Sequence, residues 1–302
     1  MSFSNDCKTE ILAQDFSEYD SAEALLYGFS CFFPNIMPYE MSISSENSEM
    51  LETMAQFYRR FDVPEEAVSV IPGKRIHSLK IQGESVCQDL INRFQISRFV
   101  PFSFLTTFLE TEEQRKAFLS GVFLAAGTLS SPSKGYHLQF TSHRLPLIRA
   151  LDSFLNENGF TPKLSRHGSH YMLYIKSSEQ IEDFLTYLGA FDNTLKLMQE
   201  KVLKDVRNTV TRRVNCENAN LEKTIQSSAK DVSLLTEFLE KGGEVLLSEE
   251  QLRIVRYRIE KPEYSLAELA SEMDDSVTKS GINHRLRRIR EIARDYLEKN
   301  EH

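Results

Sequence analysis

The feature that most constrains the fold of this chain is an internal repeat of about 95 residues, in which two segments carry the same order of predicted elements. The order is an apolar helix, a strand, an amphipathic helix, a pair of strands and a closing helix. Alternation such as that of Ile76, Leu79 and Ile81 among polar neighbours is typical of half-buried antiparallel strands. The repeat therefore predicts an α+β domain built from two similar halves.

The predicted elements fall at matching places in the two copies. In the first copy we expect helices at 22–33, 48–61 and 85–94, and strands at 40–44, 68–71 and 75–81. In the second copy we expect helices at 112–126, 145–158 and 178–188, and strands at 136–140, 163–166 and 171–176. The expected domains are two halves at 1–95 and 96–205, a helical or well-hydrogen-bonded connector at 206–224, and an all-α domain at 225–302.

The stretch 265–294 predicts two short helices joined by a tight polar turn, the second of them basic. Ser265 and Glu268 have the spacing of a capping box, and the first helix should end at residues 274–275. Thr278 can cap the second helix, whose apolar residues recur at spacings of four, three and four and should face the core. These apolar residues are Ile282, Leu286, Ile289 and Ala293. The pattern is that of a helix-turn-helix, so double-stranded DNA is the expected partner.

The opposite face of the second helix is the expected DNA reader. In a major groove, asparagine can hydrogen-bond to the edge of an adenine and arginine to the edge of a guanine, while other basic side chains bind phosphates. The alternative is a solvated basic face on an ordinary surface helix. The predicted DNA-binding residues are Thr278, Lys279, Ser280, Asn283, His284, Arg285, Arg287, Arg288 and Arg290. The residues expected to contact phosphates are Lys279, Arg285, Arg288 and Arg290.

Two neighbouring features belong to the same predicted domain. Gly281 costs the reader helix about 1 kcal/mol relative to alanine, and close approach to the preceding helix or to a DNA backbone would explain its presence. A helix at 250–260 should support the reader from below. Its arginines Arg253, Arg256 and Arg258 are candidate phosphate contacts at the rim.

Charge is unevenly distributed along the chain. The net charge is −8, and residues 1–95 alone carry 15 acidic and 7 basic side chains, whereas the rest of the chain is balanced. Between Lys279 and Arg294 the only acidic residue is Glu291. Because the local field rather than the net charge meets phosphates, the basic helix can bind DNA while the first third should be repelled from it.

Composition narrows the class of protein further. There is no apolar run near 18 residues and no basic-then-apolar leader, so we expect a cytoplasmic, nucleoid-associated protein without a membrane partner. The four cysteines lie too far apart for a paired zinc motif. His167 and His170 flank a Gly-Ser pair that more often marks a turn between strands than a metal site. We therefore expect no metal, cofactor or disulfide.

These motifs together resemble the WhiA family of bacterial DNA-binding regulators. The match rests on Ser2-Phe3-Ser4 with Lys8 and Glu10, and on FLSGVFLAAGTLSSP at 118–132 followed by YHLQF. It also rests on Arg213, Asn215, Cys216, Glu217, Ala219, Asn220 and Lys223 in the connector, on SLAEL at 265–269 and on KSGINHRL at 279–286. The resemblance implies a pseudo-twofold, LAGLIDADG-like αββαββα domain followed by an all-α helix-turn-helix domain. It also implies a sequence-specific transcriptional regulator of cell division or sporulation genes.

One departure from the homing-endonuclease pattern bears on mechanism. Residues 119–127, LSGVFLAAG, align with LAGLIDADG without a gap, and the eighth place, which holds a metal-binding carboxylate in an active nuclease, is Ala126. In the first repeat two registers put either Cys31 or Phe33 at that place. Neither helix end thus offers a carboxylate, and we predict that the domain is catalytically dead. Gly121 and its small neighbours then indicate close helix packing.

Two other roles remain open at this point. Nuclease activity would survive if carboxylates such as Asp20 or Glu23 were recruited from elsewhere. Alternatively, the acidic first third, with Glu46, Glu49 and Glu52, would dock a basic protein such as another transcription regulator or RNA polymerase. The resemblance also places Lys163, Arg166 and Lys176 on strands that face DNA in homing endonucleases, as secondary phosphate contacts.

Overall fold

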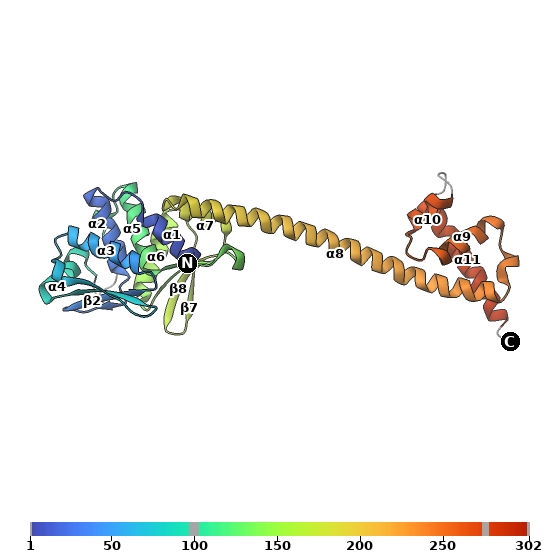
Figure 1. The fold of residues 1–302 in the computed structure, drawn as a ribbon, viewed down its shortest axis with the longest axis horizontal. Helices are drawn as coiled ribbons and strands as arrows, with labels where there is room; N and C mark the ends of the chain where they lie inside the picture. Colours follow the sequence, from blue (N-terminus) through green and yellow to red (C-terminus); the bar gives the residue numbers. More distant parts are fainter. Residues whose placement is uncertain (1, 97–102, 274–277, 301–302) are drawn as a thin grey trace. The chain divides into compact units, whose positions relative to one another are not determined.

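The computed structural model describes residues 2–96, 103–273 and 278–300 (Figure 1). It divides into two compact units, Met1–Lys204 and Asp205–His302, which we call the repeat unit and the C-terminal unit. The finer boundaries at residues 95 and 225 stay predictions, and the helix end expected at residues 274–275 lies outside the described residues. Within the described ranges, no helix is both long enough and apolar enough to cross a membrane.

Each half of the repeat unit contains an antiparallel sheet, and the two sheets have the same strand order. In the first half the order is β1-β2-β4-β3, formed by β1 (Asn35–Ile36), β2 (Glu40–Ser45), β3 (Val68–Ile71) and β4 (His77–Gln82). In the second half it is β5-β6-β8-β7, formed by β5 (Gly127–Leu129), β6 (Leu138–Ser142), β7 (Lys163–His167) and β8 (His170–Ile175). The repeat predicted from the sequence is confirmed.

The alternation of buried and exposed side chains along the strands determines how the strands pair in both sheets. Met41 pairs with Ile81 and Ile43 with Leu79 across β2 and β4, and all four side chains are buried. Phe140 pairs with the buried Leu173 at the corresponding place in the second sheet. Because successive side chains of a strand point to opposite faces, this register directs one face of each sheet to the core.

The helices cover that core face. They are α1 (Phe3–Leu12), α2 (Tyr19–Cys31), α3 (Ser48–Arg60), α4 (Glu84–Phe94), α5 (Glu112–Ala126), α6 (Leu145–Glu157) and α7 (Ser178–Tyr187). In Figure 1, α2, α3 and α5 lie above the strands of the repeat unit. The predicted helices are confirmed, whereas α1, β1 and β5 were missed. The buried face of α1 includes Ser4, Cys7 and Lys8, so its apolar periodicity is weak.

The two halves meet where α2 and α5 cross at a pair of glycines. A Cβ atom on Gly28 would lie 2.1 Å from the carbonyl oxygen of Phe118, and one on Gly121 would lie 2.0 Å from that of Leu25. Each glycine thus touches the carbonyl three residues before the other glycine, so the contact has pseudo-twofold symmetry. The symmetry makes Phe33 the counterpart of Ala126, five residues after each glycine, and this settles the register that the sequence left open.

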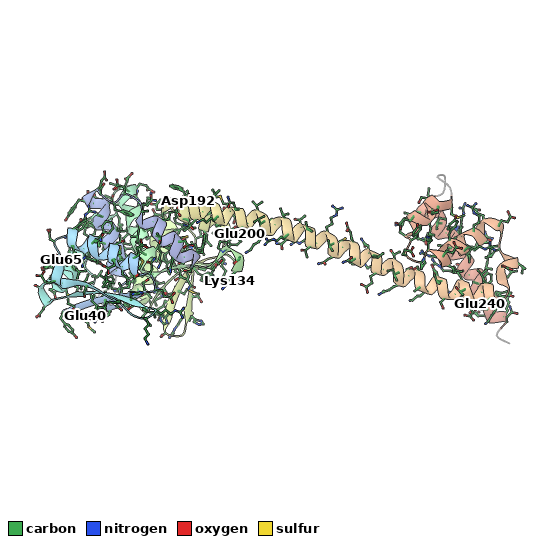
Figure 2. All side chains as sticks on the ribbon, in the orientation of Figure 1. Glu40, Glu65, Lys134, Asp192, Glu200 and Glu240 are labelled. Atoms are coloured by element: carbon green, nitrogen blue, oxygen red, sulfur yellow. The ribbon has the colours of Figure 1, made fainter. Side chains whose placement is uncertain are left out.

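The longest helix, α8 (Phe191–Glu240), begins in the repeat unit and ends in the C-terminal unit. It includes residues 206–224, which are therefore helical, one of the two forms expected for this segment, while its role as a connector stays a prediction. The carboxylate of Glu10 on α1 accepts hydrogen bonds from the backbone N–H groups of Asp192, at 2.6 Å, and Asn193, at 3.0 Å. Both lie in the first turn of α8, where Figure 2 labels Asp192. Glu10 therefore acts as the N-terminal cap of α8, in place of a local capping residue.

The C-terminal unit packs the end of α8 against three shorter helices, α9 (Glu249–Glu260), α10 (Leu266–Met273) and α11 (Lys279–Lys299). The core takes Leu235 and Phe238 from α8, Ile254 and Val255 from α9, and Leu269 from α10. From α11 it takes Ile282, Leu286, Ile289, Ala293 and Leu297. The predicted helix pair and its apolar stripe are confirmed.

The glycine crossing yields a stability prediction. We expect Gly28→Ala and Gly121→Ala each to lower the free energy of unfolding by about 3 kcal/mol, because the new methyl group collides with backbone that cannot rotate away. Urea unfolding followed by circular dichroism would measure this loss. Gly281→Ala is the matched control: of the described atoms its methyl group would meet only Thr278 Oγ1, at 3.4 Å, and the change should gain about 1 kcal/mol of helix propensity. Equal effects at all three sites would contradict the packing argument.

Candidate nucleic-acid interface

Local hydrogen bonds define where the two helices of the motif begin. At α10 the Ser265 hydroxyl accepts from the Glu268 backbone N–H at 3.3 Å, and the Glu268 carboxylate accepts from the Ser265 N–H at 2.7 Å. These hydrogen bonds also hold the pKa of Glu268 below its ordinary value. At α11 the Thr278 hydroxyl accepts from the Gly281 N–H at 3.2 Å. Both caps predicted from the sequence are confirmed, and they fix how α11 presents its side chains.

One face of α11 is fully buried and the other is left to solvent. Ile282, Leu286 and Ile289 have no exposed surface. The predicted reader residues that are exposed are Thr278, Lys279, Ser280, Asn283, His284, Arg287 and Arg288. Arg287 makes an exposed ion pair with Glu291 at 3.4 Å, which is too weak to withhold it from a ligand.

Two of the predicted phosphate contacts form ion pairs with neighbouring helices. Arg290 pairs with Asp231 of α8 at 2.9 Å, and the Asp231 side chain is only 8% exposed. We therefore correct the assignment of Arg290 from a phosphate contact to a group that braces α11. Arg285 pairs with Glu250 of α9 at 2.8 Å, but this pair is exposed to solvent, so the phosphate role of Arg285 stays a prediction.

One of the phosphate contacts predicted on α9 needs a similar correction. Arg258 is 2% exposed, donates to the Tyr264 carbonyl at 2.6 Å and lies 3.9 Å from Asp231. Its predicted phosphate contact is therefore wrong, and burial lowers the pKa of its guanidinium. Arg253 and Arg256 are exposed, and their phosphate role stays a prediction.

Among the described residues, only one atom lies close to the Cα atom's free side at Gly281. Apart from Thr278 Oγ1 at 3.4 Å, no described atom lies within 4 Å of where its Cβ atom would be. Of the two explanations that the sequence offered, close approach to the preceding helix therefore has no support among the described residues. The glycine leaves the surface of the first turn of α11 without a side chain, next to the exposed Ser280.

The repeat unit contains the place where an active homing endonuclease would hold metal, at the C-terminal ends of α2 and α5. The structure puts Phe33 and Ala126 at the two equivalent positions, and neither side chain has a ligand atom. Lys8 instead donates to the Leu124 carbonyl at 3.0 Å, and Arg144 donates to the Cys31 carbonyl. The helix ends thus bind two cations, and this donor set does not fit a divalent metal.

The predicted histidine turn is confirmed. His167 pairs with His170 at the end of the β7–β8 hairpin, and Gly168 in the turn has φ +59°. The His143 and His170 rings lie with their centroids 3.8 Å apart. Across the described residues, no group of three or more histidine, cysteine, aspartate or glutamate side chains is placed to hold a metal ion.

The candidate secondary contacts on the second sheet divide between its faces. Lys163 pairs with Tyr174 on the face opposite the buried Leu173, and Lys176 stacks over the Tyr174 ring at 5.1 Å. Arg166 pairs with Tyr171, which shares the face of Leu173. The outer face therefore carries the two lysines, and Arg166 does not belong to it.

Two family models match the chain. The model of the WhiA LAGLIDADG-like domain matches residues 115–207, and that of the WhiA C-terminal HTH domain matches residues 210–293.

Relatives of this chain also carry the name WhiA. The chain is 39% identical over 181 residues to the probable cell division protein WhiA of Clostridium novyi (strain NT), which covers 60% of this chain and 57% of that protein. It is 36% identical over 209 residues to the protein of the same name from Clostridium botulinum (strain Hall), with 69% and 65% covered. The match therefore spans less than two thirds of the length of these relatives, which are named as cell division proteins and not as enzymes.

A solved structure is similar over nearly the whole chain. It is full-length DUF199/WhiA from Thermotoga maritima, with a TM-score of 0.58 and 22% identity over 98% of this chain and 99% of that chain. At this identity the likeness shows the fold alone.

The ion pairs of α11 lead to a matched comparison. Asp231→Asn should lower the free energy of unfolding of the C-terminal unit by about 3–5 kcal/mol, because it leaves buried Arg258 without a countercharge. Glu250→Gln removes the exposed partner of Arg285 and should cost less than about 1 kcal/mol. Urea unfolding of the two variants measures the difference. A loss in Asp231→Asn no larger than in Glu250→Gln would show that the buried cluster does not brace α11.

Proposed function

The chain belongs to the WhiA family, whose two domain models together match more than half of it, and we propose that it is a sequence-specific DNA-binding transcriptional regulator of bacterial cell division or sporulation genes. The observation that carries the proposal is the division of α11 into a fully buried apolar face and an exposed polar, basic face. A helix so held can enter a major groove without losing contact with its own domain.

The exposed face of α11 suggests which residues read bases and which bind phosphates. Asn283 and Arg287 lie one helical turn apart on α11, so both can reach base edges from one groove position. Lys279 and Arg288 flank them and can bind phosphates, with Thr278, Ser280 and His284 as further contacts. The bare first turn at Gly281 would allow close approach of the DNA backbone to the N-terminus of α11, where the helix dipole favours an anion.

We propose that the repeat unit has no nuclease activity. Its helix ends carry Phe33 and Ala126, and no carboxylate lines the cavity there among the described residues. Glu23, a residue that could have been recruited, forms an ion pair with Arg93. Glu23 also lies ten residues before Phe33, which corresponds to a distance of about 15 Å at the rise of an α-helix. A role in docking a basic protein remains part of the proposal, since Glu46, Glu49 and Glu52 are exposed.

Base reading is tested by a matched pair of arginine and lysine variants. Arg287→Ala should weaken binding to selected genomic DNA by about 1–3 kcal/mol, with a much smaller loss on random duplex, because it removes a base contact. Lys299→Ala removes the same charge from α11 about three turns further on and should change both affinities little. DNA-binding isotherms of the full chain, recorded at several salt concentrations, measure these affinities. Equal losses on both DNAs for Arg287→Ala would refute its base-reading role.

The absence of nuclease activity has its own test. We expect supercoiled plasmid to stay intact when the full chain is incubated with Mg²⁺ or Mn²⁺, because neither helix end offers a metal ligand. Gel electrophoresis detects nicking. Glu23→Gln and Asp20→Asn serve as controls: metal-dependent cleavage that either variant abolishes would restore the enzyme hypothesis, whereas cleavage that both retain would point to a contaminant.

A further inference from the structure

The C-terminal ends of α2 and α5 each bind one cationic side chain, in a symmetric manner. Lys8 donates to the carbonyl of Leu124, and Arg144 donates to that of Cys31. Leu124 and Cys31 each lie three residues after the crossing glycine of their own helix, so the two cations bind equivalent carbonyls. They come from unrelated elements, α1 and the residue before α6, so the repeat itself does not explain the correspondence.

These cations border a cavity of about 340 Å³. The volume is at the lower end of the range for small-ligand pockets. Hydroxyl groups and two histidines, His143 and His170, complete the polar wall, and none of the described residues that line the cavity is acidic. The hydroxyl side chains belong to Ser44, Ser45, Thr128, Thr141 and Ser142.

The charge of this wall favours an anion. A helix C-terminus carries roughly half a negative charge, so the ends of α2 and α5 together offset about one of the two positive charges of Lys8 and Arg144. One positive charge thus remains even with both histidines neutral. Lys8 is 9% exposed, and burial lowers its pKa to about 8. An anion beside its ammonium group would offset part of that burial cost.

We propose that this cavity binds the phosphate group of a small phosphate compound. Phosphate oxygens accept hydrogen bonds from ammonium, guanidinium and hydroxyl groups together, which is the donor set that the wall supplies. The buried position of Lys8 favours a small compound over the backbone of a DNA duplex. The site belongs to the repeat unit and does not depend on the DNA-reading role proposed for α11.

The test is calorimetric titration of the full chain with inorganic phosphate and with pyrophosphate, at constant ionic strength set by sodium chloride. We expect saturable binding that weakens at least tenfold in Lys8→Met and in Arg144→Gln. Lys299→Gln, which removes an exposed charge from the last turn of α11 in the C-terminal unit, is the control and should bind as the parent does. Circular dichroism without phosphate checks that each variant is folded.

Thr141→Val keeps the test decisive if the charge variants do not fold. It removes one hydroxyl from the cavity wall at an exposed strand position, and we expect a severalfold loss of phosphate affinity. The proposal is overturned if no saturable binding occurs, or if the folded cavity variants bind as well as Lys299→Gln. It is also overturned if random duplex DNA displaces phosphate from the parent protein, since the anion bound there would then be a nucleic-acid backbone.

Discussion

The repeat unit depends on the close crossing of α2 and α5. Only glycine fits at Gly28 and Gly121, because any Cβ atom would meet a backbone oxygen of the other helix at about 2 Å. The crossing brings the two halves together, each with its own four-stranded sheet. It also sets which residues sit at the helix ends, and so it makes Phe33 and Ala126 equivalent positions of the two halves. The LAGLIDADG-like architecture is thus held by packing and does not depend on metal ligands at these positions.

The short helix α1 connects two features that are distant in the sequence. Its Lys8 reaches the end of α5, and its Glu10 caps the start of α8. Hydrogen bonds of this kind hold α1 in one position, because an uncapped helix start and a buried ammonium group without a partner would both cost free energy. Whatever binds beside Lys8 would therefore act on the element that secures the first turn of α8.

Basic residues of the C-terminal unit serve two purposes. Asp231 is a buried carboxylate that holds Arg290 and lies beside Arg258, so these arginines orient α11 against α8 and α9. Others, including Arg287 and Arg288, project into solvent. The first group fixes the angle of the helix, and the second group is available to a ligand. A count of positive charges overstates the number of basic residues available to a ligand, because it cannot separate the two groups.

The sequence alone determined the order and type of nearly all the major elements, because alternation, apolar stripes and caps such as Thr278 are local signals with a known period. It also determined which face of α11 is buried. The tertiary structure alone decided between Cys31 and Phe33, since that choice depends on which glycine touches which carbonyl. It alone removed Arg258 and Arg290 from the predicted phosphate contacts and brought Lys8 and Arg144 to one cavity. These results depend on contacts between residues far apart in the chain, and no local pattern records such contacts.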